Sequence, residues 1–234
     1  MSKLWQRTPK PHRLTRQLDA RVSMCRALRV ARGRVIRGVD RERTEFVPPE
    51  DWHEPTADHS ANYRVIVQAP GRGYRHAVSA RDVRDRLDAL PAAMCMPLNV
   101  VQLSRMTRKK RTFPCYGMQW GSALYLYPIE ESMIEHFSRP PLPAERQEVA
   151  MFGGKWKFKE GYWQLIWTAA TLRDFYLNNV LMHELGHLLD ERNTRYKDRE
   201  RFAEWFALKY GSLGNSARPR RRGRRVVRRH GRRR

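Results

Sequence analysis

The clearest periodic pattern in the chain lies between residues 171 and 193. Five apolar side chains recur there at intervals of three or four positions: Leu177, Val180, Leu181, Leu185 and Leu188. That spacing places them on one face of an α-helix. Thr171 and Asp174 have the spacing of a capping box. The pattern therefore predicts one helix that begins at about Thr171 and runs toward Asn193.

Two further segments carry helical patterns. Residues 197–211 predict a second helix that ends at Gly211, since glycine is common just past a helix C-terminus. Residues 79–91 predict a third, with Ser79 and Asp82 as its capping box and Pro91 as its stop. Its buried face is expected to hold Val83, Leu87 and Leu90.

Strand patterns alternate with these helices along the chain. Residues 62–79 predict a strand, a turn and a second strand, and residues 98–104 predict another. Residues 116–128 alternate between polar and apolar side chains and are expected to form one strand. Residues 156–167 predict a hairpin that turns at Lys159–Gly161. Together the elements predict an α+β fold with a small mixed sheet.

Charge is distributed very unevenly along the 234 residues, whose formal net charge is +23. Residues 1–45 hold thirteen Lys or Arg against four acids, and residues 218–234 hold eleven arginines and no acid, while the middle is nearly balanced. We therefore expect a basic N-terminal arm over 1–45, a folded domain over 46–213 and an Arg-rich tail over 214–234. Neither end has enough apolar content to pack a core.

The tail suggests a polyanionic partner. Arginines neutralise phosphates and release condensed counterions without regard to base sequence, so nucleic acid is the expected partner. The contacts are assigned to seven residues: Arg220, Arg221, Arg222, Arg224, Arg225, Arg228 and Arg229. Acidic lipid, an acidic protein, or a solubilising or targeting role of the tail are the alternatives.

Cysteine content and hydropathy bear on the compartment. Three cysteines without metal-type spacing (Cys25, Cys95 and Cys115) favour a reducing, intracellular environment. The most apolar window, residues 89–103, is broken by prolines and is too short for a transmembrane segment. We expect a cytoplasmic or nucleic-acid-associated protein, with an Arg-rich mitochondrial transit peptide at the N-terminus as the alternative.

Candidate metal chemistry lies on the first predicted helix. His183 and His187 are four residues apart, so their imidazoles share one face and can bind one zinc ion (Zn²⁺). Glu184 lies about 100° around the helix from His183, within reach of a zinc-bound water as general base. The alternative is an ordinary amphipathic helix that happens to carry two histidines.

The segment His183–His187, HELGH, resembles the signature of the zincin metallopeptidases. Zincins of the glutamate-ligand (gluzincin) type carry a downstream E-x-x-x-D or E-x-x-x-E pair, and lethal-factor-type and ImmA/IrrE-like peptidases have similar motifs. By that resemblance Glu200 is the third ligand, and Glu204 is the outer carboxylate that orients an imidazole. The order of the two could be reversed, and whichever carboxylate is unused belongs to a solvated helix face.

The same resemblance suggests two further roles. Zincins bind substrate as an added strand at a sheet edge upstream of the active helix, which points to residues 121–127, and in particular to Ala123, Leu124 and Tyr125. An ordinary core strand is the alternative. Tyr196 is a candidate donor to the developing oxyanion, and a loop tyrosine without a role is its alternative. His53 and His59 cannot share a helical face around Pro55 and receive no role.

These features predict a zinc metallopeptidase, a hydrolase that cleaves peptide bonds with a Glu-activated, zinc-bound water and is held near nucleic acid by its basic arms. Its substrate would be a protein or peptide. One competing hypothesis is a non-catalytic nucleic-acid-binding or structural protein on a degenerate zincin scaffold. Another is a regulator with a purely structural zinc site, which a fourth protein ligand would indicate.

Overall fold

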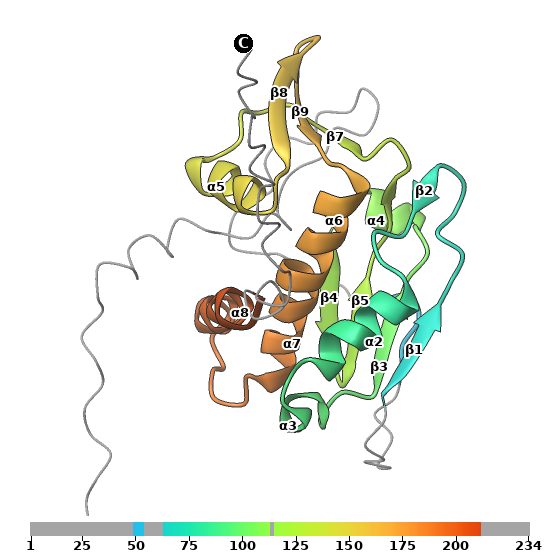
Figure 1. Ribbon diagram of the computed structural model, residues 1–234, viewed down its shortest axis with the longest axis vertical. Helices are drawn as coiled ribbons and strands as arrows, with labels where there is room; N and C mark the ends of the chain where they lie inside the picture. Colours follow the sequence, from blue (N-terminus) through green and yellow to red (C-terminus); the bar gives the residue numbers. More distant parts are fainter. Residues whose placement is uncertain (1–48, 54–62, 113–114, 212–234) are drawn as a thin grey trace, which may run out of the picture.

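The computed structural model describes residues 49–53, 63–112 and 115–211, and they form a mixed α+β fold built around a four-stranded sheet (Figure 1). In spatial order, its strands are β1 (Arg64–Val67), β3 (Val100–Leu103), β5 (Ala123–Leu126) and β4 (Gly117–Trp120). β1, β3 and β5 are parallel, and β4 is antiparallel to β5. The α+β prediction is confirmed, while the two basic ends lie outside the described residues.

Two smaller sheets flank the first. One pairs β2 (Tyr74–Arg75) with β6 (Ile129–Glu130). The other has the antiparallel order β7 (Ile134–Phe137), β9 (Tyr162–Ile166) and β8 (Lys155–Lys159). The β8–β9 hairpin projects at the top of Figure 1. Its predicted turn is confirmed, because Glu160 and Gly161 have φ of 54° and 81°, as in the two-residue turns that join the strands of a β-hairpin.

The helices with the clearest sequence signals bury their apolar faces against the main sheet. Figure 1 shows α2 (Ala80–Asp88) and the run α6 (Ala169–Phe175), η2 (Tyr176–Val180) and α7 (Leu181–Leu189) on the same side of it. α8 (Tyr196–Gly211) packs against α7. Shorter helices are α3 (Ala92–Cys95), α4 (Arg108–Thr112) and α5 (Pro143–Met151).

The prediction for α2 is confirmed in detail. The Asp82 N–H donates to Ser79 Oγ (3.1 Å), and the Ser79 N–H donates to Asp82 Oδ2 (2.9 Å). Val83 and Leu87 are fully buried, as the helical spacing predicts. This helix connects the parallel strands β1 and β3 and covers β1.

The helix predicted to begin at Thr171 begins earlier and is not uniform. Thr168 is its N-cap, because its hydroxyl accepts the Thr171 N–H (3.2 Å), and Asp174 instead accepts from the Asn178 side chain (2.6 Å). Residues 176–180 form a π-helical turn ahead of α7. Such turns are frequent beside functional sites.

Two other expectations need correction, and a third is confirmed. Residues 116–128 are two strands rather than one, because Gly121 (φ 56°) turns the chain between β4 and β5. The two strands predicted within residues 62–79 are confirmed as β1 and β2, which pair with β3 and β6 in different sheets. α8 begins at Tyr196 and includes Gly211 as its last residue.

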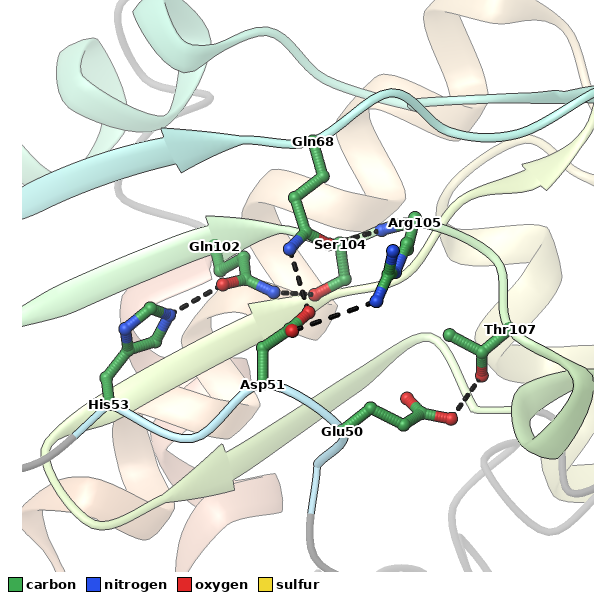
Figure 2. A network of polar contacts seen from close by, with 8 residues as sticks. All are labelled: Glu50, Asp51, His53, Gln68, Gln102, Ser104, Arg105 and Thr107. Carbon is green, nitrogen blue, oxygen red and sulfur yellow. Dashed lines mark hydrogen bonds and ion pairs between the residues drawn. The ribbon is translucent and has the colours of Figure 1, made fainter.

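The main sheet is covered on both faces. On the helix side, Val101 and Leu124 belong to the principal core, whereas Val100 and Tyr125 face the opposite side. Residues 49–53 cross that opposite face and are held by side-chain hydrogen bonds (Figure 2).

In Figure 2, the His53 imidazole reaches Gln102 Oε1 (2.6 Å), and Asp51 accepts from Gln68 Nε2 (2.8 Å). The His53 ring also stacks on Tyr125, with centroids 6.0 Å apart. His53, to which the sequence analysis assigns no role, therefore fixes this segment to the sheet. None of the helices in the described ranges combines the length and the hydropathy of a transmembrane segment.

Candidate metal centre

Two helices bring three potential metal ligands together. α7 places the Nε2 atoms of His183 and His187 3.1 Å apart, as expected for residues four positions apart on one face. α8 adds the Glu200 carboxylate, whose oxygens lie 3.7 Å from His183 Nε2 and 3.5 Å from His187 Nε2. Among the described residues, this is the group of His, Cys, Asp and Glu side chains whose spacing suits a metal ion.

The distances between these atoms are compatible with coordination of one zinc ion. Ligand atoms at about 2.0–2.1 Å from a tetrahedral ion lie roughly 3.3–3.4 Å from one another. Here the two Nε2 atoms are 3.1 Å apart, and the nearest Glu200 oxygen is Oε1 for His187 (3.5 Å) and Oε2 for His183 (3.7 Å). Two imidazoles and one carboxylate also form a donor set typical of catalytic zinc. The residues present therefore fit a zinc ion.

Burial keeps both imidazoles in the form that binds metal. It lowers the pKa of His183 to about 3, with a smaller contribution from His187, and the pKa of His187 to about 4, with a smaller contribution from Arg199. At neutral pH both rings are uncharged and keep a nitrogen lone pair. Metal ligands must be deprotonated, so no proton has to be displaced from either ring near pH 7.

The close approach of the two ligand helices depends on a glycine. A Cβ atom on Gly186 would lie 2.9 Å from the Ala203 Cα and 3.0 Å from the Phe206 Cβ. Ala203 is itself fully buried. The small residues at this crossing let α8 lie near enough to α7 for Glu200 to reach the two histidines.

The connection between the ligand helices is held by polar contacts. The buried Asp190 carboxylate accepts the backbone N–H groups of Arg192 (3.3 Å) and Asn193 (3.1 Å). Arg199 Nη2 donates to the His187 carbonyl (3.2 Å), which lies at the end of α7. A cation at a helix C-terminus is favourable, and here it also joins α8 to the last turn of α7.

Glu184 points from α7 toward the edge strand β4. It is buried, and its Cγ and Oε1 atoms lie 2.8 Å from the position that a Cβ on Gly117 would occupy. Only glycine leaves space for the carboxylate at this point. The Gln119 backbone N–H donates to the Glu184 side chain, so both contacts fix the carboxylate against β4.

The surroundings also tune the basicity of Glu184. Burial first, and the charge of Glu200 second, raise its pKa to about 8, while the Gln119 N–H and Lys110 act in the opposite direction. A divalent cation beside Glu200 would offset the second cause. A carboxylate with a pKa near neutrality suits a general base, which has to accept and release a proton at working pH.

The remaining predicted residues lie at different distances from this centre. Glu204 is one turn further along α8, half-buried, and outside the ligand group. Tyr196 is the first residue of α8 and is 56% exposed, so it begins a helix rather than standing in a loop. The orienting role of Glu204 and the oxyanion role of Tyr196 stay predictions. The seven tail arginines lie outside the described residues.

The predicted substrate strand is wrong. Ala123, Leu124 and Tyr125 lie in β5, which is fully buried and hydrogen-bonded to β3 on one side and β4 on the other. No backbone edge of β5 is free to pair with a peptide. The turn at Gly121 is the reason, since it places residues 117–120 outside β5 as the edge strand of the sheet.

Sequence reasoning missed Gly117 and Asp190. A glycine inside an apolar strand pattern indicates a close approach by another group, so Gly117 carried a usable signal. Asp190 resembles an ordinary polar residue at the end of a helix.

Comparison with protein-family models, curated proteins and solved structures gives no match for this chain.

Proposed function

We propose that the chain is a zinc-dependent peptidase of the zincin type, in which His183, His187 and Glu200 hold the metal and Glu184 is the general base. One observation carries the proposal: two imidazole Nε2 atoms lie 3.1 Å apart, each with an oxygen of the Glu200 carboxylate at 3.5 or 3.7 Å, and the residue next to one ligand is a buried glutamate. The combination joins a metal site to a proton acceptor.

The position of this group in the fold supports the proposal. In zincins, by the resemblance above, an edge strand of a small mixed sheet lies beside the active helix. Here the antiparallel edge strand β4 contacts α7. An extended peptide would pair with β4, the strand nearest Glu184, through backbone hydrogen bonds that tolerate many side chains.

The chemistry divides between the metal and the chain. Bound zinc would act as a Lewis acid that polarises the peptide carbonyl. Glu184 would take a proton from the attacking water and deliver it to the leaving amine. The Gln119 N–H holds the Glu184 carboxylate in one orientation, and the neutral imidazoles of His183 and His187 would hold the ion.

The donor set favours a catalytic over a closed structural site. Structural zinc takes four protein ligands, whereas catalytic zinc keeps three and leaves one position open. Within the described ranges, no fourth His, Cys, Asp or Glu joins the three. The competing proposal is a non-catalytic protein on the same scaffold. Both proposals include binding of the Arg-rich tail to nucleic acid.

The test compares the same substitution at two glutamates of one helix region. Glu184→Gln should retain zinc and lose hydrolysis of a fluorogenic peptide library, because an amide accepts no proton. Glu191→Gln, at an exposed position just past α7, should retain both. Hydrolysis by Glu184→Gln at the wild-type rate would overturn the assignment of the base. Zinc-loaded wild-type protein that cleaves no peptide in the library would favour the non-catalytic protein.

A further inference from the structure

One face of the sheet β7–β9–β8 carries a row of lysines. Lys155, Lys157 and Lys159 alternate along β8, and all three are exposed. Because side chains two residues apart point to the same side of a strand, the lysines share one face at intervals of about 6.7 Å. Regular positive charges along an extended line are complementary to the regular negative charges of a phosphodiester chain.

The neighbouring strands extend this face. Tyr162 lies opposite Lys159 and Gln164 lies opposite Lys157, and on β7 His136 is the partner of Gln164. Tyr162 is 41% exposed, and the His136 and Gln164 side chains are 3.1 Å apart. We call this surface the lysine face: Lys155, Lys157, Lys159, Tyr162, Gln164 and His136.

The opposite face of the same sheet packs on the core in part, since Phe158 near the hairpin turn is 58% exposed there. Leu165 and Phe137 are buried there, and Trp156 packs on Phe137 with ring centroids 4.9 Å apart. The sheet is thus fixed on one side and free of core contacts on the other. The three lysines are therefore held in a fixed arrangement by the pairing of β8 in the sheet.

The lysines have few acidic partners. Lys159 pairs with the exposed Glu160 (3.0 Å). Across the described ranges, neither Lys155 nor Lys157 has an ion pair with a carboxylate. Their charges are available to an external anion at little cost in broken contacts.

We infer that the lysine face binds single-stranded nucleic acid. The lysines meet successive phosphates, and the exposed Tyr162 ring offers a stacking surface for an unpaired base. A duplex keeps its base faces stacked inside, so it offers phosphates to the lysines but nothing to the tyrosine. This inference assigns a contact in the folded domain, separate from the Arg-rich tail, and it does not rest on the metal centre.

Lysines on an edge strand have another common purpose, which is to prevent pairing with other sheets. The two explanations differ in what the charges contact. The test therefore uses the full chain and two triple variants that remove equal charge. One is Lys155→Gln, Lys157→Gln, Lys159→Gln, and the control is Arg64→Gln, Arg81→Gln, Arg84→Gln, which alters exposed arginines of β1 and α2.

Binding to a twenty-nucleotide oligothymidylate is measured as a function of salt by fluorescence anisotropy. The lysine triple should reduce the log–log salt slope by roughly two, since each lost phosphate contact on a single strand contributes about 0.7. The control triple should leave the slope unchanged. Both should keep the wild-type melting temperature and zinc content. Equal slopes for the two triples would overturn the inference and leave the lysines as protection of the edge strand.

A single substitution separates stacking from charge. Tyr162→Ala should weaken binding to the oligothymidylate about fivefold or more, with the salt slope unchanged, and should leave binding to a duplex of equal length unaffected. If the duplex is weakened as much as the single strand, or if neither is weakened, the assignment to single strands is wrong.

Discussion

The α7–α8 pair and the lysine face both gather ionisable side chains, but in opposite surroundings. His183 and His187 are largely buried, and the pKa of each is lowered by burial. Lys155, Lys157 and Lys159 stand in solvent on a strand. The first group is held by helix packing, and the second by the alternation of side chains along β8.

This difference determines how each region responds to change. A buried site depends on close contacts such as that of Gly186 with Ala203. Because the interior is closely packed, one added methyl group there would displace α8 and with it the ligand Glu200. A row of exposed charges acts by summation, since each contributes a small and independent part. Substitutions should therefore have large effects at the metal centre and small ones on the lysine face.

The largest effect is expected when a metal ligand is removed. Glu200→Gln should weaken zinc binding by more than the roughly 10- to 100-fold that an outer carboxylate contributes. Glu204→Gln should stay within that range, because Glu204 lies outside the ligand group. Competition titration with a fluorescent zinc chelator measures both affinities. A larger loss for Glu204→Gln would reverse the two roles.

Packing between the helices gives the next effect. Gly186→Ala should lower the free energy of unfolding by about 1–3 kcal/mol, because the new methyl group meets the Ala203 backbone. Helix propensity alone would give the opposite sign, about 1 kcal/mol of stabilisation. Denaturant unfolding measures the sign. A stabilised variant would show that the helices are not in close contact at this position.

The pH dependence of stability, measured on protein from which a chelator has removed the metal, tests whether His183, His187 and Glu184 are buried. Lowered histidine pKa values make stability fall as the pH drops from about 6.5 toward 4, since only the unfolded state binds protons there. The raised pKa of Glu184 makes stability fall as the pH rises toward about 8.

Stability without metal should therefore peak near pH 6.5, with net slopes on the order of 1 kcal/mol per pH unit on either side. Denaturant unfolding at pH 5, 6.5 and 8 gives the profile. In Glu184→Gln the decline above pH 6.5 should disappear while the decline below it remains. A flat profile in the wild type would contradict the burial of these groups.

Stability should hardly depend on the lysine face. Lys157→Gln should change the free energy of unfolding by less than about 0.5 kcal/mol, because the side chain is exposed and has no ion pair among the described residues. Thermal unfolding at low and high salt measures it. A loss above 1 kcal/mol would mean that the charge is part of the folded core.

Local patterns in the sequence predicted the helices and the spacing of the candidate metal ligands better than the order of the sheet. The spacing of His183 and His187 and the capping box of Ser79 and Asp82 depend on residues within one or two turns, so helical periodicity is enough to find them. The start of α6 was missed because Thr168 and Thr171 are both suitable N-cap residues, each followed by residues that can form the first turn of a helix. Sequence alone does not choose between them.

Sheet order depends on contacts between distant segments. Residues 123–126 have the pattern of any half-buried strand, and only the turn at Gly121 together with pairing to β3 makes β5 central. The predicted substrate strand therefore lies in the internal strand β5, and not in the edge strand β4. The contact of Gly117 with Glu184 also joins segments far apart in sequence, and a strand glycine was its only signal.

Zinc content of the purified full-length protein tests the central claim most directly. Elemental analysis should find about one zinc per chain in the wild type and in His136→Ala, which alters an exposed histidine of β7. His183→Ala and His187→Ala should each retain less than about a tenth of that amount and melt at a lower temperature. Full zinc occupancy in both of these variants, or none in a wild type supplied with zinc, would contradict a metal centre on α7 and α8.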